Sequence, residues 1–129
     1  MNTFRFHREL DIPFLQKRFG NDPFSAREVF GSFVEMADHE LTILESAKDQ
    51  RRFSAFARIA SRLKDGLDAV GLKGERDRID QLRSRYALEG VDEDFEKMAE
   101  EFIDGIRNKS SLLRIEVQRL DKFIESSAQ

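Results

Sequence analysis

The 129-residue sequence contains no cysteine and no tryptophan, and it has one tyrosine and two prolines. Without cysteine the chain forms no disulfide bond and carries no thiol chemistry, which suits a protein of the reducing cytosol. Both prolines, Pro13 and Pro23, lie near the start of the chain. The rest of the sequence is therefore free of the residue that most strongly interrupts helices.

Long apolar runs and clusters of basic residues are also missing. No apolar run approaches the roughly 20 residues that span a bilayer, and the N-terminal stretch lacks the apolar core of a signal peptide. The net charge is −3, and the 22 Lys and Arg residues are scattered along the chain rather than grouped in a nucleic-acid-binding stretch. We therefore predict a cytoplasmic protein that binds neither nucleic acid nor membrane.

The most abundant large apolar residue type is phenylalanine, with 12 copies, which predicts a core built from aromatic packing. A chain of this length is large enough to bury one continuous core. We expect residues 1–129 to form a single domain, with a helical bundle over about 22–125 and a helix or docked arm over 1–20.

The segment 53–71 shows the clearest helical period. Its apolar residues recur every three or four positions, which places them on one stripe of an amphipathic helix. We predict one helix over the whole segment and look for function on the flank of the stripe. The stripe consists of Phe53, Phe56, Ala60, Leu63, Leu67 and Val70, and the flank of Ala57, Ser61, Lys64, Asp65 and Asp68.

Capping residues predict where two earlier helices begin and end. Asp11 before Ile12-Pro13 predicts a short helix that ends at Phe19-Gly20. Asp22 with Pro23 begins the next helix, which runs to about Lys48; Ser25 with Glu28 is an alternative capping box.

Two more helices follow the segment 53–71. A shorter one, marked by Leu72, Ile79 and Leu82, stops at Gly90, and Asp92 caps a last one that continues almost to the C-terminus. The polar patch 108–111 leaves open whether this last helix bends. Amphipathic helices with short connections predict an all-α fold, an antiparallel up-down four-helix bundle with a short additional N-terminal helix.

The run Ala60-Ser61-Arg62-Leu63-Lys64-Asp65-Gly66, with Gly71 closing the helix, resembles the signature of histidine-containing phosphotransfer (HPt) domains. That signature reads roughly Ala-His-x-Leu-Lys-Gly-Ser, with a further Gly soon after. The run 19–23 and the amphipathic helix after it are similar to the opening of the second helix in many HPt domains. The resemblance covers about residues 10–125 and implies a four-helix bundle that binds receiver domains or histidine kinases.

Two positions depart from the family pattern. Aligned without a gap, the phospho-accepting histidine falls on Ser61 and the small glycine falls on Asp65, while the lysine is matched by Lys64. A serine phosphate ester is too stable to pass phosphate on reversibly, and Asp65 would add a carboxylate about one helical turn from the acceptor position. We therefore predict a degenerate HPt protein that is not an enzyme and needs no cofactor or metal.

The resemblance implies that the chain acts by docking to a partner: a response-regulator receiver domain or a histidine kinase. Lys64 beside an aspartate is also typical of an ordinary solvated helix surface. The predicted docking surface consists of Ser54, Ala57, Arg58, Ser61, Arg62, Lys64, Asp65 and Asp68.

Two alternatives remain open from the sequence. The chain could be a helical interaction or assembly protein unrelated to phosphorelay, including a homodimer through the last helix from Leu113 onward. It could also be a phosphotransferase that uses a non-standard histidine, His39 or His7. A di-iron site through Glu35 and His39 is rejected, because the second Glu-x-x-His pattern that such a site needs does not occur.

Overall fold

The computed structural model describes residues 3–127, and all regular secondary structure in this range is α-helical, which confirms the all-α prediction. Among these residues, no helix combines the length and apolar character that crossing a membrane requires. The helices are α1 (Ile12–Phe19), α2 (Pro23–Asp49), α3 (Phe53–Ser61), α4 (Lys64–Ala69), α5 (Lys73–Glu89) and α6 (Glu93–Ser127).

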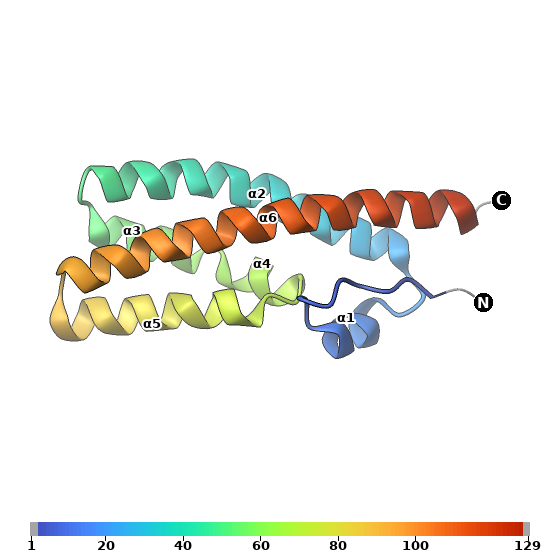
Figure 1. The fold of residues 1–129 in the computed structure, drawn as a ribbon, viewed down its shortest axis with the longest axis horizontal. Helices are drawn as coiled ribbons and strands as arrows, with labels where there is room; N and C mark the ends of the chain where they lie inside the picture. Colours follow the sequence, from blue (N-terminus) through green and yellow to red (C-terminus); the bar gives the residue numbers. More distant parts are fainter. Residues whose placement is uncertain (1–2, 128–129) are drawn as a thin grey trace.

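The two longest helices, α2 and α6, pack against each other along the molecule (Figure 1). α3 and α4 return along α2, and α5 returns beneath α6, so that consecutive long stretches of chain run in opposite directions. α1 and the segment before it lie at the other end of the molecule from the α5–α6 corner (Figure 1). This arrangement places α3 beside α5, between the supports that α2 and α6 provide.

Three aspartates cap helices as the sequence predicts. The carboxylates of Asp11, Asp22 and Asp92 accept hydrogen bonds from backbone N–H groups three residues later, at 3.3, 3.1 and 2.8 Å. Each bond satisfies one of the free N–H groups of a first helical turn. Ser25 lies inside α2 and donates its N–H to Asp22, so Asp22 is the cap of this helix and the alternative capping box is not used.

The core is a continuous set of aromatic and aliphatic side chains. Phe6 of the N-terminal segment packs against Phe19 and Phe30, with ring centroids 6.3 and 5.8 Å apart. At the other end, the Phe53 and Phe95 rings meet edge to face at 5.3 Å, a favoured aromatic geometry. All six residues of the predicted stripe in 53–71 are buried.

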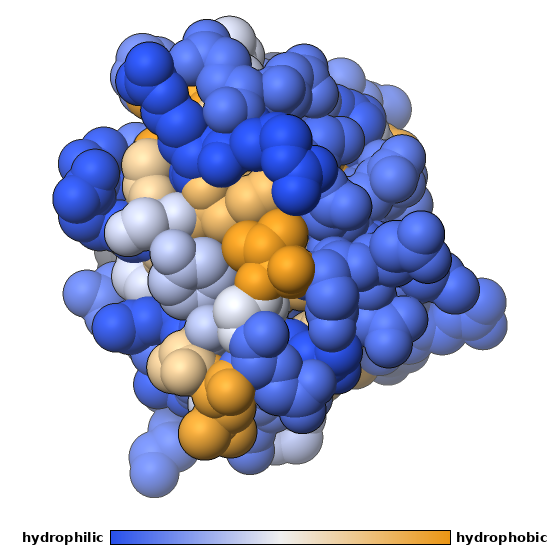
Figure 2. Space-filling view, turned by 90° about the vertical axis from the view of Figure 1, so that its left-hand side faces the viewer, coloured by the Kyte–Doolittle hydropathy of each residue, from blue (hydrophilic) through white to orange (hydrophobic). Residues whose placement is uncertain are grey.

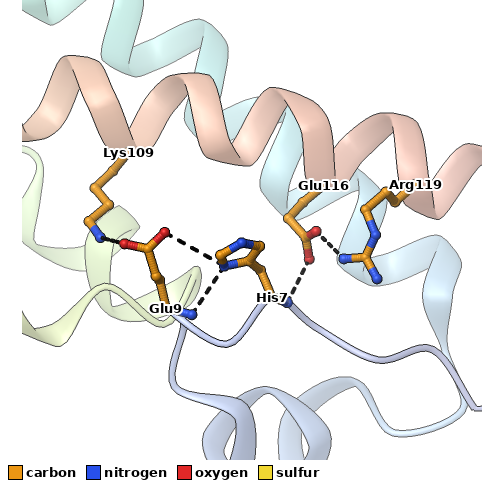
Figure 3. Close-up of polar contacts among 5 residues, drawn as sticks. All are labelled: His7, Glu9, Lys109, Glu116 and Arg119. Carbon is orange, nitrogen blue, oxygen red and sulfur yellow. Dashed lines mark hydrogen bonds and ion pairs between the residues drawn. The ribbon is translucent and has the colours of Figure 1, made fainter.

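Residues 3–11, before α1, form a docked arm and not a helix. Phe4, Phe6 and Leu10 are buried, while polar contacts attach the arm to α6 (Figure 3). The Arg5 carbonyl accepts a hydrogen bond from Arg119 at 2.8 Å. The sequence predicts either a helix or a docked arm here, and the structure shows the docked arm.

The single helix predicted over 53–71 is wrong, because the structure divides it into α3 and α4 at Arg62 and Leu63. The N–H groups of these two residues donate to the carbonyls of Ile59 and Ala60, each three residues back and 3.0 Å away. This tighter pattern replaces the α-helical bond to the fourth residue back. The local winding changes at the position next to Ser61, while the buried stripe remains on the core side.

The last helix runs without interruption through the polar patch 108–111. The sequence leaves a bend open here because no apolar residue stands between Ile106 and Leu112. Ser110 is buried and occupies the core position between Ile106 and Leu113, so the period of the buried face continues. A small polar residue at one buried position therefore does not end the helix.

Close packing of α4 on α2 depends on Gly66. A Cβ atom at this position would lie 2.7 Å from Cδ2 of Phe33 and 2.9 Å from Cε of Met36. Since the Phe33 ring is buried in the core, it has little room to move.

We predict that Gly66→Ala lowers the free energy of unfolding by about 1–3 kcal/mol, because the added methyl group overpacks this contact. Gly31→Ala is the matched control: it also lies in a helix, and a Cβ there would meet no atom within 4 Å. In the control, the free energy of unfolding should rise by about 0.5–1 kcal/mol, because alanine has a higher helix propensity than glycine. Urea unfolding measures both, and a Gly66→Ala protein as stable as wild type would contradict the packing.

Candidate functional site

Ser61 is the last residue of α3 and is partly exposed. Its side chain does not point into the packed interior. The hydroxyl donates a hydrogen bond to the carbonyl of Ala57, one turn earlier in the same helix, at 3.0 Å. This bond holds the hydroxyl against its own backbone and leaves it without a neighbouring base.

Ser61 lines a shallow groove of about 330 Å³ between α3 and α5. α3 contributes Ser54, Ala57 and Arg58 beside Ser61, and these four belong to the predicted docking surface. The other wall comes from Arg83, Tyr86 and Ala87 of α5. The lining contains two guanidinium groups and no carboxylate.

The two arginines of this groove have no direct ion-pair partner among the described residues, although the charge of Arg83 acts on the Asp80 carboxylate. Among residues 3–127, Arg58 and Arg83 form no ion pair with a carboxylate, unlike Arg27 or Arg114, which pair across the α2–α6 contact. Two cations without an ion-pair partner make the groove a favourable place for an anionic group.

The remaining predicted docking residues lie outside the groove. Lys64 forms an ion pair with Asp80 of α5, and Asp68 accepts a hydrogen bond from Arg76 at 3.2 Å. Arg62 turns toward α2, where its guanidinium lies 4.0 Å from the buried carboxylate of Glu40. These residues connect α3 and α4 to neighbouring helices.

Asp65 is exposed and does not line the groove. The sequence predicts that its carboxylate stands beside the acceptor position, as it would on one continuous helix. The break at Arg62 and Leu63 falls between Ser61 and Asp65, so their spacing along one ideal helix no longer applies. The groove itself is cationic.

Sequence reasoning did not find the α5 wall of the groove. Tyr86 continues the apolar spacing of Ile79 and Leu82 along its helix, and its ring lies 5.7 Å from that of Phe95. Arg83 and Ala87 sit four residues apart on the flank of that stripe, as ordinary surface positions do. Which flank of α5 faces α3 depends on helix packing, and no local signal in the sequence carries that information.

Exposed apolar side chains lie close to the groove in the chain. Leu88, which follows the groove residue Ala87, is 83% exposed, and Val91 in the α5–α6 corner is 37% exposed. Figure 2 views this end of the molecule and shows hydrophobic residues (orange) among hydrophilic ones (blue). A leucine as exposed as Leu88 provides apolar contact area for a partner on the same helix as one wall of the groove.

The two histidines occupy different environments. His39 is exposed on α2, and His7 lies half-buried in the arm, where its Nδ1 accepts the Glu9 N–H at 3.1 Å (Figure 3). The same Nδ1 lies 3.8 Å from the Glu9 carboxylate. Neither histidine lines the α3–α5 groove.

No protein-family model, curated protein or solved structure matches the chain. The resemblance to HPt domains therefore stays a prediction from the sequence, made from the runs 19–23 and 60–66.

The Lys64–Asp80 ion pair gives a prediction for pH dependence. Hydrogen bonding to Lys64 holds the pKa of Asp80 below its ordinary value of 3.8, with smaller help from the charges of Arg76 and Arg83. A lowered pKa in the folded protein stabilises the fold above pH 3.8, and this contribution is lost as the pH falls through the folded pKa.

We expect Lys64→Met to raise the pKa of Asp80 toward its ordinary value, because the main cause of the shift is removed. A ¹³C NMR titration of the side-chain carboxylates of both proteins measures this directly. Lys48→Met, which changes a lysine of α2 that forms no contact with Asp80, should leave the Asp80 titration unchanged. An Asp80 titration that is identical in Lys64→Met and wild type would show that the pair does not form in solution.

Proposed function

We propose that this chain is an HPt-like four-helix bundle protein without a phospho-accepting histidine, which binds a receiver domain or histidine kinase and transfers no phosphate. The observation that carries the proposal is the position of Ser61. The residue aligned with the phospho-acceptor lies in a solvent-accessible groove that Arg58 and Arg83 also line, and it is not in the core.

Charge complementarity supports a receiver domain as the partner. A phosphorylated receiver carries an aspartyl phosphate, and a groove with Arg58 and Arg83 and without a carboxylate attracts such a group. Ser54, Ala57, Ser61 and Ala87 are small, so a partner's backbone can approach the groove closely. The exposed Leu88 adds apolar area on α5, the helix that forms one wall of the groove.

The chemistry of Ser61 accounts for the absence of transfer in this proposal. In a phosphorelay, an imidazole nitrogen attacks the phosphorus and the aspartate carboxylate leaves. Here the hydroxyl donates its proton to the Ala57 carbonyl, and no carboxylate or histidine lines the groove to act as a base. The complex would therefore persist as a bound state and compete with the receiver's other partners.

We expect the protein to bind at least one receiver domain or sensor kinase of its own cell, and to bind that receiver more tightly with beryllofluoride, a mimic of the aspartyl phosphate. The double variant Arg58→Glu/Arg83→Glu should weaken binding at least about tenfold, because like charges would replace complementary ones. Isothermal titration calorimetry with each receiver gives the dissociation constants.

Lys122→Glu is the control for this charge reversal, since Lys122 is exposed on α6 and lies outside the groove. It should leave binding within about twofold of wild type. The absence of saturable binding to every receiver and kinase of the cell would overturn the proposal. An equal loss of binding in the control and in the double variant would show that the α3–α5 groove is not the binding surface.

A second expected result concerns phosphate transfer. Wild-type protein incubated with a ³²P-phosphorylated receiver should retain no acid-labile label, because Ser61 cannot form a phosphoramidate. Acid-labile label on the wild type would contradict the proposal. Its loss in His39→Ala or His7→Ala would then identify the protein as a phosphotransferase that uses that histidine.

A further inference from the structure

A second cavity, of about 510 Å³, lies between the N-terminal arm, α5 and α6. Its charged lining has more acids than bases: Glu9, Glu75, Glu101 and Asp104 against Arg78 and Lys109. The cavity shares no residue with the α3–α5 groove, so an inference drawn from it does not rest on the proposed function.

Several of these charges are already paired. Lys109 donates a hydrogen bond to Glu9 at 3.2 Å and so attaches the arm to α6 at the edge of the cavity (Figure 3). Asp104 accepts a hydrogen bond from Arg107 at 3.3 Å. Within residues 3–127, this leaves two carboxylates of the lining, Glu75 and Glu101, without an ion-pair partner. Arg78 is the one cation of the lining that is also left unpaired in this range.

Glu75 is the unusual member of this set. It is only 8% exposed, and its Oε2 atom has no hydrogen-bond partner among the described residues. Burying a carboxylate oxygen without a hydrogen-bond donor is unfavourable, because the oxygen loses its hydration and gains no partner in exchange. A cation or hydrogen-bond donor that reaches this oxygen would remove much of that cost.

Gly105 of α6 leaves space beside the Glu75 carboxylate. A Cβ atom at Gly105 would lie 2.8 Å from Oε2 of Glu75 and 3.4 Å from Nη1 of Arg78. Any other residue at this position would fill the gap between the two charged groups. The absence of a side chain on α6 therefore keeps the buried oxygen next to the cavity.

The lining fits an organic cation better than a metal ion. In the part of the chain that the structure describes, no three acidic or histidine side chains converge closely enough to hold a metal. Leu112 provides an apolar wall, and the volume suits a molecule of several heavy atoms. We propose that this cavity binds a small molecule with a protonated amine, whose ammonium group donates to the Glu75 carboxylate.

Arg78 is the internal competitor for the same carboxylate. It lies three residues after Glu75 in α5, so a rotation of its side chain could bring the guanidinium onto the acid. The proposal therefore predicts opposite effects for the two residues. Removing the Glu75 charge weakens amine binding, and removing the Arg78 charge strengthens it.

Calorimetric titration of the full chain with 1,4-diaminobutane and with agmatine tests the proposal, and uncharged 1,4-butanediol serves as the control ligand. The diamine or agmatine should bind saturably and the diol should not. Glu75→Gln keeps the shape of the side chain and should weaken binding at least about tenfold, as expected for the loss of a charged hydrogen bond. Arg78→Gln should tighten it.

Glu100→Gln is the matched control, an exposed acid of α6 outside the cavity, and its binding should remain within about twofold of wild type. Gly105→Ala keeps every charge and fills the gap beside the Glu75 carboxylate, so it should also weaken binding. It provides an independent test if Glu75→Gln does not fold. The proposal is overturned if neither amine binds wild type or Arg78→Gln at millimolar concentration. Binding that persists unchanged in Glu75→Gln or in Gly105→Ala also overturns it.

Discussion

Apolar packing between α2 and α6 supports every other element of the molecule. α1, α3 and α4 contact α2, and α5 contacts α6. Fully buried phenylalanines lie on both partners, Phe30 on α2 and Phe102 on α6, and each buried side chain of this size stabilises the fold by about 1.5–3 kcal/mol. Ion pairs of Arg27 with Asp121 and of Arg114 with Asp38 cross the same contact at its solvent-exposed edge. Exposed pairs of this kind contribute little to stability, so the apolar packing dominates.

The α3–α5 groove follows from this support. α3 is held mainly by α2 and α5 mainly by α6, and the two meet through fewer contacts of their own. Their adjoining faces carry small or cationic side chains, so a shallow groove remains between them and is not filled by the core. The Lys64–Asp80 ion pair and the Asp68–Arg76 hydrogen bond join the following helix, α4, to α5. Removing either pair would therefore change the groove by shifting α5, which forms one of its walls.

Charge is distributed unevenly between the two hollows of the surface. The α3–α5 groove has unpaired arginines and no acid, while the cavity beside the arm has an excess of carboxylates. A net charge of −3 conceals this separation, because it averages over the whole chain. The sign of the nearby charges decides which group each hollow attracts. At physiological salt, interactions between exposed charges more than about 8–10 Å apart are largely screened.

Local patterns in the sequence determined the helices and the buried face of each, because helical period and capping depend on residues within about four positions of one another. The caps at Asp11, Asp22 and Asp92, and the stripe from Phe53 to Val70, could be found in this way. Only the tertiary structure decided the break after Ser61, the pairing of Lys64 with Asp80, and the contribution of Arg83 and Tyr86 to the groove. These features depend on which faces of different helices meet, and that is set by the packing of the entire core.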